Sequence, residues 1–84
     1  MTVDYHVRLV RIMNEVLAEA QRATAKHAPM RSPHEGISVL REEFEELWDH
    51  VKADTGETKE AREEAIQVAA MAVRYIHDLC DDRK

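Results

Sequence analysis

Hydrophobic positions recur at helical spacing in three successive segments of the chain. Residues 3–26 carry two neighbouring apolar rows. The first row is Val3, Val7, Val10 and Leu17, and the second is Leu9, Ile12, Met13, Val16 and Ala20. Residues 33–53 carry a single seam with steps of three and four, made of Ile37, Leu40, Phe44, Leu47 and Val51. This seam is typical of packing along a neighbouring helix at a shallow angle. A third helix is predicted over residues 58–79, so the pattern indicates an all-α protomer of three helices.

Residues with strong positional preferences mark the ends of these helices. Ser32 is a good N-cap, Pro33 suits the first helical position, and Glu35 completes a capping box. Gly56 is expected to end the second helix. Thr58 is the predicted N-cap of the third.

The third helix is apolar almost all round. From Ala65 to Ile76, only Gln67 and Arg74 are polar. A helix of this kind is buried on nearly every side, which two companion helices cannot achieve. We therefore expect an antiparallel hairpin of the second and third helices that assembles, through the third helix, into a homo-oligomeric bundle as a dimer or tetramer.

Length and composition agree with one small helical domain over residues 1–84. Only two glycines and two prolines are present, hydrophobic residues make up 44%, and the single cysteine, Cys80, excludes an internal disulfide. No stretch approaches the roughly 20 apolar residues of a membrane span, and no signal peptide opens the chain. We expect a cytoplasmic protein without a membrane partner.

The acidity of the chain is concentrated in one segment. The net charge is −5, and residues 41–64 hold ten acidic and four basic residues, a balance of −6. Such a surface repels nucleic acid polymers, which are not expected as partners.

Four polar side chains are predicted to converge within the acidic segment. Glu43 and Glu46 lie three residues apart on one helix, and Glu64 and Gln67 lie three apart on the next. Folding the two helices back about Thr55 brings each pair level with the other. One interpretation is a solvated acidic face whose charges pair with basic neighbours, namely Arg41, Lys52, Lys59 and Arg62. The other is a site for a hard divalent cation, because facing carboxylate pairs hold such cations in helical bundles.

The same residues carry a resemblance to a known family. The segments Glu42-Glu43-Phe44-Glu45-Glu46 and Glu64-Ala65-Ile66-Gln67 resemble the E-E-x-x-E and E-x-x-D motifs of the MazG-like all-α NTP pyrophosphohydrolases. The step of 21 residues from Glu43 to Glu64 and the preceding His34-Glu35 are also similar to that family. The match covers residues 33–79 and is closest to short bacterial and phage-type members.

The resemblance implies a metal-dependent hydrolase. Glu43, Glu46 and Glu64 would be the catalytic carboxylates and would ligate Mg²⁺, or alternatively Mn²⁺, with Glu42 as a possible further ligand. The substrate would be a nucleoside triphosphate, cleaved to the monophosphate and pyrophosphate. Members of the family work as dimers or tetramers, which agrees with the expectation from the third helix.

Gln67 departs from the family pattern, which has Asp at this position. Glutamine offers only a neutral carbonyl oxygen and would be a weak metal ligand. Three outcomes are open: Glu42 or Glu63 takes over, metal binds only together with substrate, or the chemistry is lost. The last outcome would leave a helical homo-oligomer that acts as an interaction or regulatory module.

Three further side chains have two interpretations each. His50, four residues after Glu46, either contacts substrate phosphate or is an exposed histidine near a helix end. Arg74 either reaches a phosphate or forms a buried structural ion pair. Trp48, on another side of its helix, indicates a partner surface, a ligand face or simple exposure.

Overall fold

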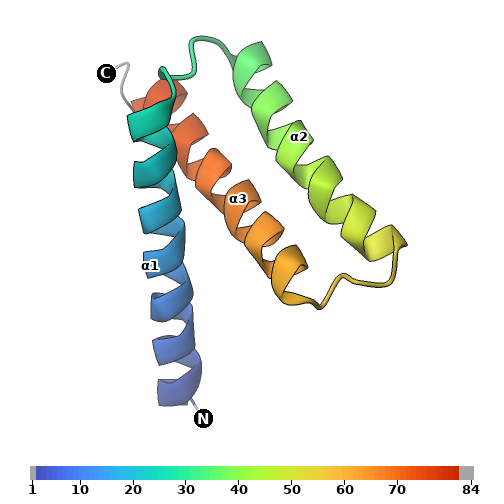
Figure 1. The fold of residues 1–84 in the computed structure, drawn as a ribbon. Helices are drawn as coiled ribbons and strands as arrows, with labels where there is room; N and C mark the ends of the chain where they lie inside the picture. The colour runs from blue at the N-terminus through green and yellow to red at the C-terminus, as the bar shows by residue number, and fades with distance from the viewer. Residues whose placement is uncertain (1, 82–84) are drawn as a thin grey trace.

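The computed structural model describes residues 2–81 and contains α-helices with no strand among them. The helices are α1 (Thr2–Lys26), α2 (Pro33–Lys52) and α3 (Lys59–Tyr75), followed by the π-helix η1 (Ile76–Asp81). α3 lies between α1 and α2 and packs on both (Figure 1). The prediction of an all-α chain with three helices is confirmed. No helix within the described part of the chain is long and apolar enough to cross a membrane.

Both predicted N-caps form. The Ser32 hydroxyl accepts a hydrogen bond from the Glu35 backbone N–H at 3.1 Å, and the Thr58 hydroxyl accepts one from the Ala61 N–H at 3.2 Å. The capping box is only half formed, because the Glu35 carboxylate accepts its hydrogen bond from the N–H of Arg31, at 2.7 Å. Each cap satisfies an N–H group that has no partner inside its own helix.

The end of α2 differs from the sequence prediction. The helix is capped by Ala53, and Asp54 takes the left-handed conformation with φ of 60°, while Gly56 has no positive φ. Asp is one of the few residues with a side chain that enters this region readily. The chain therefore turns two residues earlier than the glycine indicated.

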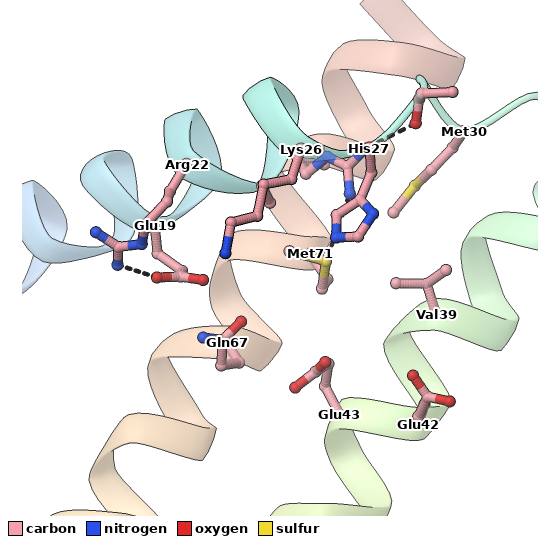
Figure 2. Close-up of a pocket in the computed structure, with 13 residues that line it drawn as sticks. Glu19, Arg22, Lys26, His27, Met30, Val39, Glu42, Glu43, Gln67 and Met71 are labelled. Atoms are coloured by element: carbon pink, nitrogen blue, oxygen red, sulfur yellow. Dashed lines mark hydrogen bonds and ion pairs between the residues drawn. The ribbon is translucent and has the colours of Figure 1, made fainter.

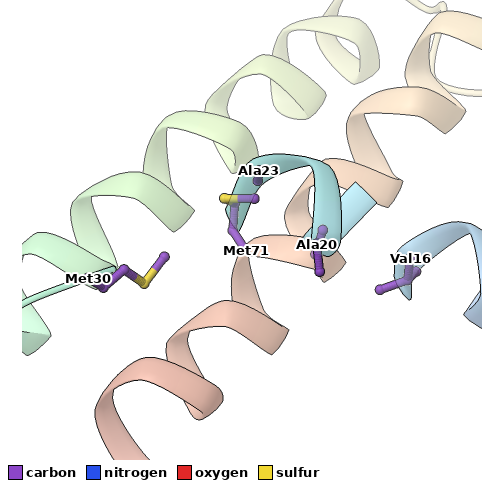
Figure 3. Packing of buried hydrophobic residues seen from close by; sticks show 6 residues of the cluster. Val16, Ala20, Ala23, Met30 and Met71 are labelled. Atoms are coloured by element: carbon purple, nitrogen blue, oxygen red, sulfur yellow. The ribbon is translucent and has the colours of Figure 1, made fainter. Parts of the chain in front are cut away.

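The core is a small cluster of aliphatic side chains where α1 crosses α3 (Figure 3). Its buried members are Val16, Ala20, Ala23, Met30, Ala70 and Met71. Three of these six residues are alanines, which let the helix backbones approach closely. The side chain of Val3, which belongs to the predicted apolar row of the first helix, lies outside the described residues.

Gly36 sets how α2 faces α3. A Cβ atom at this position would lie 2.6 Å from Cδ2 of the Tyr75 ring, so only glycine fits without a shift of its neighbours. This approach turns the Gly36 side of α2 toward α3. Three of the five seam residues consequently remain exposed in the single chain, with exposed fractions of 57% for Ile37, 55% for Phe44 and 47% for Val51. The predicted third helix is likewise not buried on every side, since Val73 of α3 and Ile76 of η1 are exposed.

The loop between α1 and α2 is fastened to the end of α3 by a buried pair of charges. Arg74 donates a hydrogen bond from Nη2 to the carbonyl oxygen of Ala28 at 3.1 Å. Asp78 accepts one at Oδ2 from the Met30 N–H at 2.9 Å, and the two charged side chains lie 3.9 Å apart. Arg74 thus forms the structural ion pair that was one of its two predicted roles.

Candidate functional site

Three carboxylates meet on the facing sides of α2 and α3. One carboxylate oxygen from each of Glu43, Glu46 and Glu64 lies within 4.8 Å of the others. Glu43 and Glu46 are adjacent because they lie three residues apart on α2, and the turn between the helices brings Glu64 of α3 to the same height. The structure therefore brings together the three residues that the sequence placed at one level.

Three of the four basic residues expected to pair with this acidic face are engaged elsewhere. Arg41 pairs with Glu45 at 3.7 Å, Lys52 with Asp49 at 3.3 Å, and Arg62 with Glu15 of α1 at 2.7 Å. Among residues 2–81, no lysine or arginine forms an ion pair with Glu43, Glu46 or Glu64. The interpretation of a charge-paired acidic face does not hold for these three side chains.

Partial burial and the crowding of like charges raise the pKa of two carboxylates of the triad. Partial burial, followed by the charge of Glu46 and a hydrogen bond shared with it, raises the pKa of Glu43 to about 7. Burial and the hydrogen bond with Glu46 also raise the pKa of Glu64, while the nearby His50 opposes this shift. Two carboxylates in contact favour sharing a proton over ionising together.

The raised pKa of Glu43 predicts how stability changes with pH in the absence of metal. Because its pKa in the folded chain lies above the unfolded value, the protonated side chain stabilises the fold below about pH 4.5. This contribution is lost as the pH rises through about 7. Glu43→Gln should therefore stabilise the protein at pH 8 by about 1 kcal/mol, a modest value because water screens partly exposed charges.

Denaturant unfolding at pH 5 and pH 8 in the presence of a chelator measures this difference. Glu45→Gln is the matched control, since Glu45 is exposed on the same helix and pairs with Arg41. If Glu43→Gln kept the wild-type pH dependence, the proposed crowding of the triad would be wrong.

A pocket of about 340 Å³ opens beside the triad, between α1, α2 and α3 (Figure 2). Glu42 and Glu43 border it from α2, and Gln67 borders it from α3 opposite Glu43. Neither Glu42 nor Gln67 belongs to the group of three converging carboxylates. Glu42 is thus close to the site without joining the donor set, and Gln67 contributes a neutral amide.

His50 and Arg74, the predicted substrate-binding residues, lie on different sides of the triad. His50 borders an open hollow together with Glu46 and Glu64, and its Nδ1 lies 3.0 Å from the Thr55 hydroxyl. Arg74 is buried and lines the 340 Å³ pocket. Trp48 is exposed, with the Lys52 ammonium 5.9 Å from the centre of its ring.

Two pocket residues carried no functional interpretation at the level of sequence. Lys26 and His27 project over the pocket from the end of α1 and the residue that follows it (Figure 2). A basic pair before a proline-containing loop was the available signal, but the sequence does not say toward which helix the loop returns. Their place beside Glu43 comes from the attachment of the loop to α3.

Comparison with protein-family models, with curated proteins and with solved structures finds no match to this chain. The site is therefore interpreted from its own chemistry. All three converging donors are carboxylate oxygens, the ligands that Mg²⁺ and Mn²⁺ prefer. The residues present fit a hard divalent cation.

Proposed function

We propose that the protein is a Mg²⁺-dependent nucleoside triphosphate pyrophosphohydrolase, with Glu43, Glu46 and Glu64 as the metal ligands. The observation that supports this most strongly is the convergence of three carboxylates within 4.8 Å, none of which is ion-paired with a lysine or arginine of residues 2–81. Three such groups repel one another when ionised, and a divalent cation removes this repulsion.

The substrate class is the one that the resemblance of residues 33–79 implies, and the coordination that Mg²⁺ prefers is compatible with it. Mg²⁺ bound by a few carboxylates keeps several water ligands and commonly bridges to substrate phosphates. When bound, it would supply charge neutralisation of the phosphates and activation of a water molecule. Glu43, Glu46 and Glu64 would hold the cation, and a carboxylate beside it would accept the proton of the attacking water. Cleavage would release the nucleoside monophosphate and pyrophosphate.

Gln67 fits this proposal as a neutral neighbour of the site. Its side chain lies across the pocket from Glu43, where its amide can donate a hydrogen bond to a phosphate or accept one from a metal-bound water (Figure 2). Glu43, Glu46 and Glu64 are then the only negatively charged ligands that the proposal gives to the cation.

The experiment that tests the function follows pyrophosphate release from a panel of nucleoside triphosphates. We expect release with Mg²⁺ or Mn²⁺ and none after chelation. If there is neither release nor metal binding at millimolar cation, the hydrolase proposal fails and the interaction-module hypothesis takes its place.

We also propose that the chain forms a homodimer through the outer faces of α2 and α3, in which the antiparallel hairpin pairs with its copy in a four-helix core. An apolar groove of about 420 Å³ lies there, lined by Ile37, Leu40, Phe44 and Val68 among others. Val68 brings α3 into this groove, whose remaining apolar residues come from α2. Ile37 and Phe44, which are exposed in the single chain, would become buried in this interface.

Replacing an apolar residue of this groove with a charged one should dissociate the dimer. Phe44→Asp places an unpaired charge in the proposed interface and should convert the protein to a folded monomer, measured by sedimentation velocity and circular dichroism. Glu45→Gln, at the next position, should remain dimeric. A wild-type protein that sediments as a well-folded monomer at micromolar concentration contradicts the dimer.

A further inference from the structure

We propose that the pocket between α1, α2 and α3 binds the pyrophosphate end of the substrate against Lys26, His27 and Arg74. The proposal rests on the hydrolase function and assigns residues to the part of the substrate that is released. Its basis is a set of basic side chains that border one pocket together with Glu43, which belongs to the carboxylate triad (Figure 2).

Arg74 is the buried member of this set, and its hydrogen-bonding capacity is largely unused. Its residue is 5% exposed, and its guanidinium carries five N–H donors. The structure gives it one ordinary hydrogen bond, to the carbonyl of Ala28 at 3.1 Å, and a weak contact from Nη1 to the Met71 sulfur at 3.8 Å. The Nε atom is buried and has no hydrogen-bond partner.

The carboxylate beside Arg74 compensates this charge only in part. Asp78 lies 3.9 Å from Nη2, and its two oxygens make shorter contacts with the Met30 N–H at 2.9 Å and with His77 at 2.8 Å. A buried cation is costly unless its donors are well paired. An anion that enters the pocket would supply further compensation for the charge of Arg74.

Lys26 and His27 provide the accessible part of the same positive region. Both are exposed, both line the pocket, and neither side chain forms an ion pair or hydrogen bond with a residue of the described chain. Arg22, one turn before Lys26, also lines the pocket but is paired with Glu19. Lys26 is therefore the cation that is free to bind a ligand at the pocket opening.

The opposite wall explains why the ligand should be a phosphate chain that also binds a cation. Glu42 and Glu43 border the pocket from α2 and would repel a bare anion. A chain of two phosphates can place one end on the basic residues and the other beside the triad. Arginine and lysine are the side chains that most often bind phosphate oxygens. A volume of about 340 Å³ lies within the range of small-molecule sites.

The test is calorimetric titration with inorganic pyrophosphate at pH 8, once in the presence of Mg²⁺ and once in the presence of a chelator. Lys26→Ala should weaken binding about tenfold, because one charge-assisted hydrogen bond is lost. Lys52→Ala is the matched control, since Lys52 is an exposed cation on α2 that pairs with Asp49 outside the pocket. It should bind pyrophosphate like the wild type.

The carboxylates that border the pocket from α2, Glu42 and Glu43, predict a substitution that strengthens pyrophosphate binding. Glu43→Gln should tighten metal-free pyrophosphate binding severalfold, because it removes a repulsive charge from the pocket. Absence of saturable binding by the wild type in the presence of Mg²⁺, or equal weakening by Lys26→Ala and Lys52→Ala, would overturn the proposal.

The two proposals fail in different ways. Pyrophosphate binding that depends on Lys26, together with no metal-dependent hydrolysis, would retain the pocket and reject the hydrolase. Hydrolysis with a Michaelis constant and turnover unchanged by Lys26→Ala would retain the hydrolase and reject the pocket.

Discussion

Glu64→Gln should lower metal-dependent pyrophosphate release by at least about 100-fold, the scale on which loss of one charge-stabilising group acts in an active site. Glutamine keeps the size of the side chain but removes the negative charge. Only two of the three carboxylates within 4.8 Å would then be left to hold the cation. The loss should be measured as initial rates over a range of Mg²⁺ concentrations, since a weakened site requires more cation for half-maximal activity.

Glu45→Gln is the control for this experiment, because Glu45 lies on α2 beside the triad and pairs with Arg41 at 3.7 Å. Its activity should stay within about twofold of the wild type, as expected for a surface charge outside the site. A thermal melt with and without Mg²⁺ gives an independent readout, because a cation that binds only the folded state raises the melting temperature. Equal activity of Glu64→Gln and Glu45→Gln would show that the triad is not the catalytic centre.

Asp78→Ala should be among the most destabilising single substitutions in the chain, at about 3 kcal/mol. It removes the acceptor of the Met30 N–H and leaves the buried Arg74 without its carboxylate partner. The expected fall in melting temperature exceeds about 10 °C for a domain of this size. Denaturant unfolding followed by circular dichroism measures the loss of free energy.

Protonation should reproduce part of this loss. Burial alone would raise the pKa of Asp78, but hydrogen bonds from His77 and the Met30 N–H, with the charge of Arg74, hold it below its usual value. The stability that Asp78 confers is therefore present above the unfolded pKa and is lost as the pH falls through the lower folded value.

Asp81→Ala is the control for Asp78→Ala. Asp81 is an exposed acid three residues later, and its replacement should change stability little. If both variants melted alike, the Arg74–Asp78 pair would not fasten the loop to α3.

The ends of the helices show where local sequence is sufficient. Ser32 and Thr58 were predicted as N-caps and act as such, because capping depends on a side chain and an N–H group only three residues away. The turn after α2 was predicted less well. Gly56 was expected to end the helix, but Ala53 caps it and Asp54 takes the left-handed conformation.

The rotation of α2 shows where local sequence is insufficient. The spacing of Ile37, Phe44 and Val51 predicts a packed seam, yet these side chains are exposed in the single chain. The contact of Gly36 with the Tyr75 ring orients the helix, and a contact between residues 39 positions apart cannot be inferred from periodicity.

The sequence by itself determined the three helices and the convergence of Glu43, Glu46 and Glu64. Both follow from short-range rules: apolar spacing, capping, and the fixed geometry of residues three apart on helices joined by a short turn. Tertiary structure alone decided that Lys26, His27 and Arg74 border one pocket beside those carboxylates. These residues come from helices that are not adjacent in the chain, and their meeting depends on the bonds of Arg74 and Asp78 to the loop. Side-chain contacts across such separations leave no periodic pattern in the sequence.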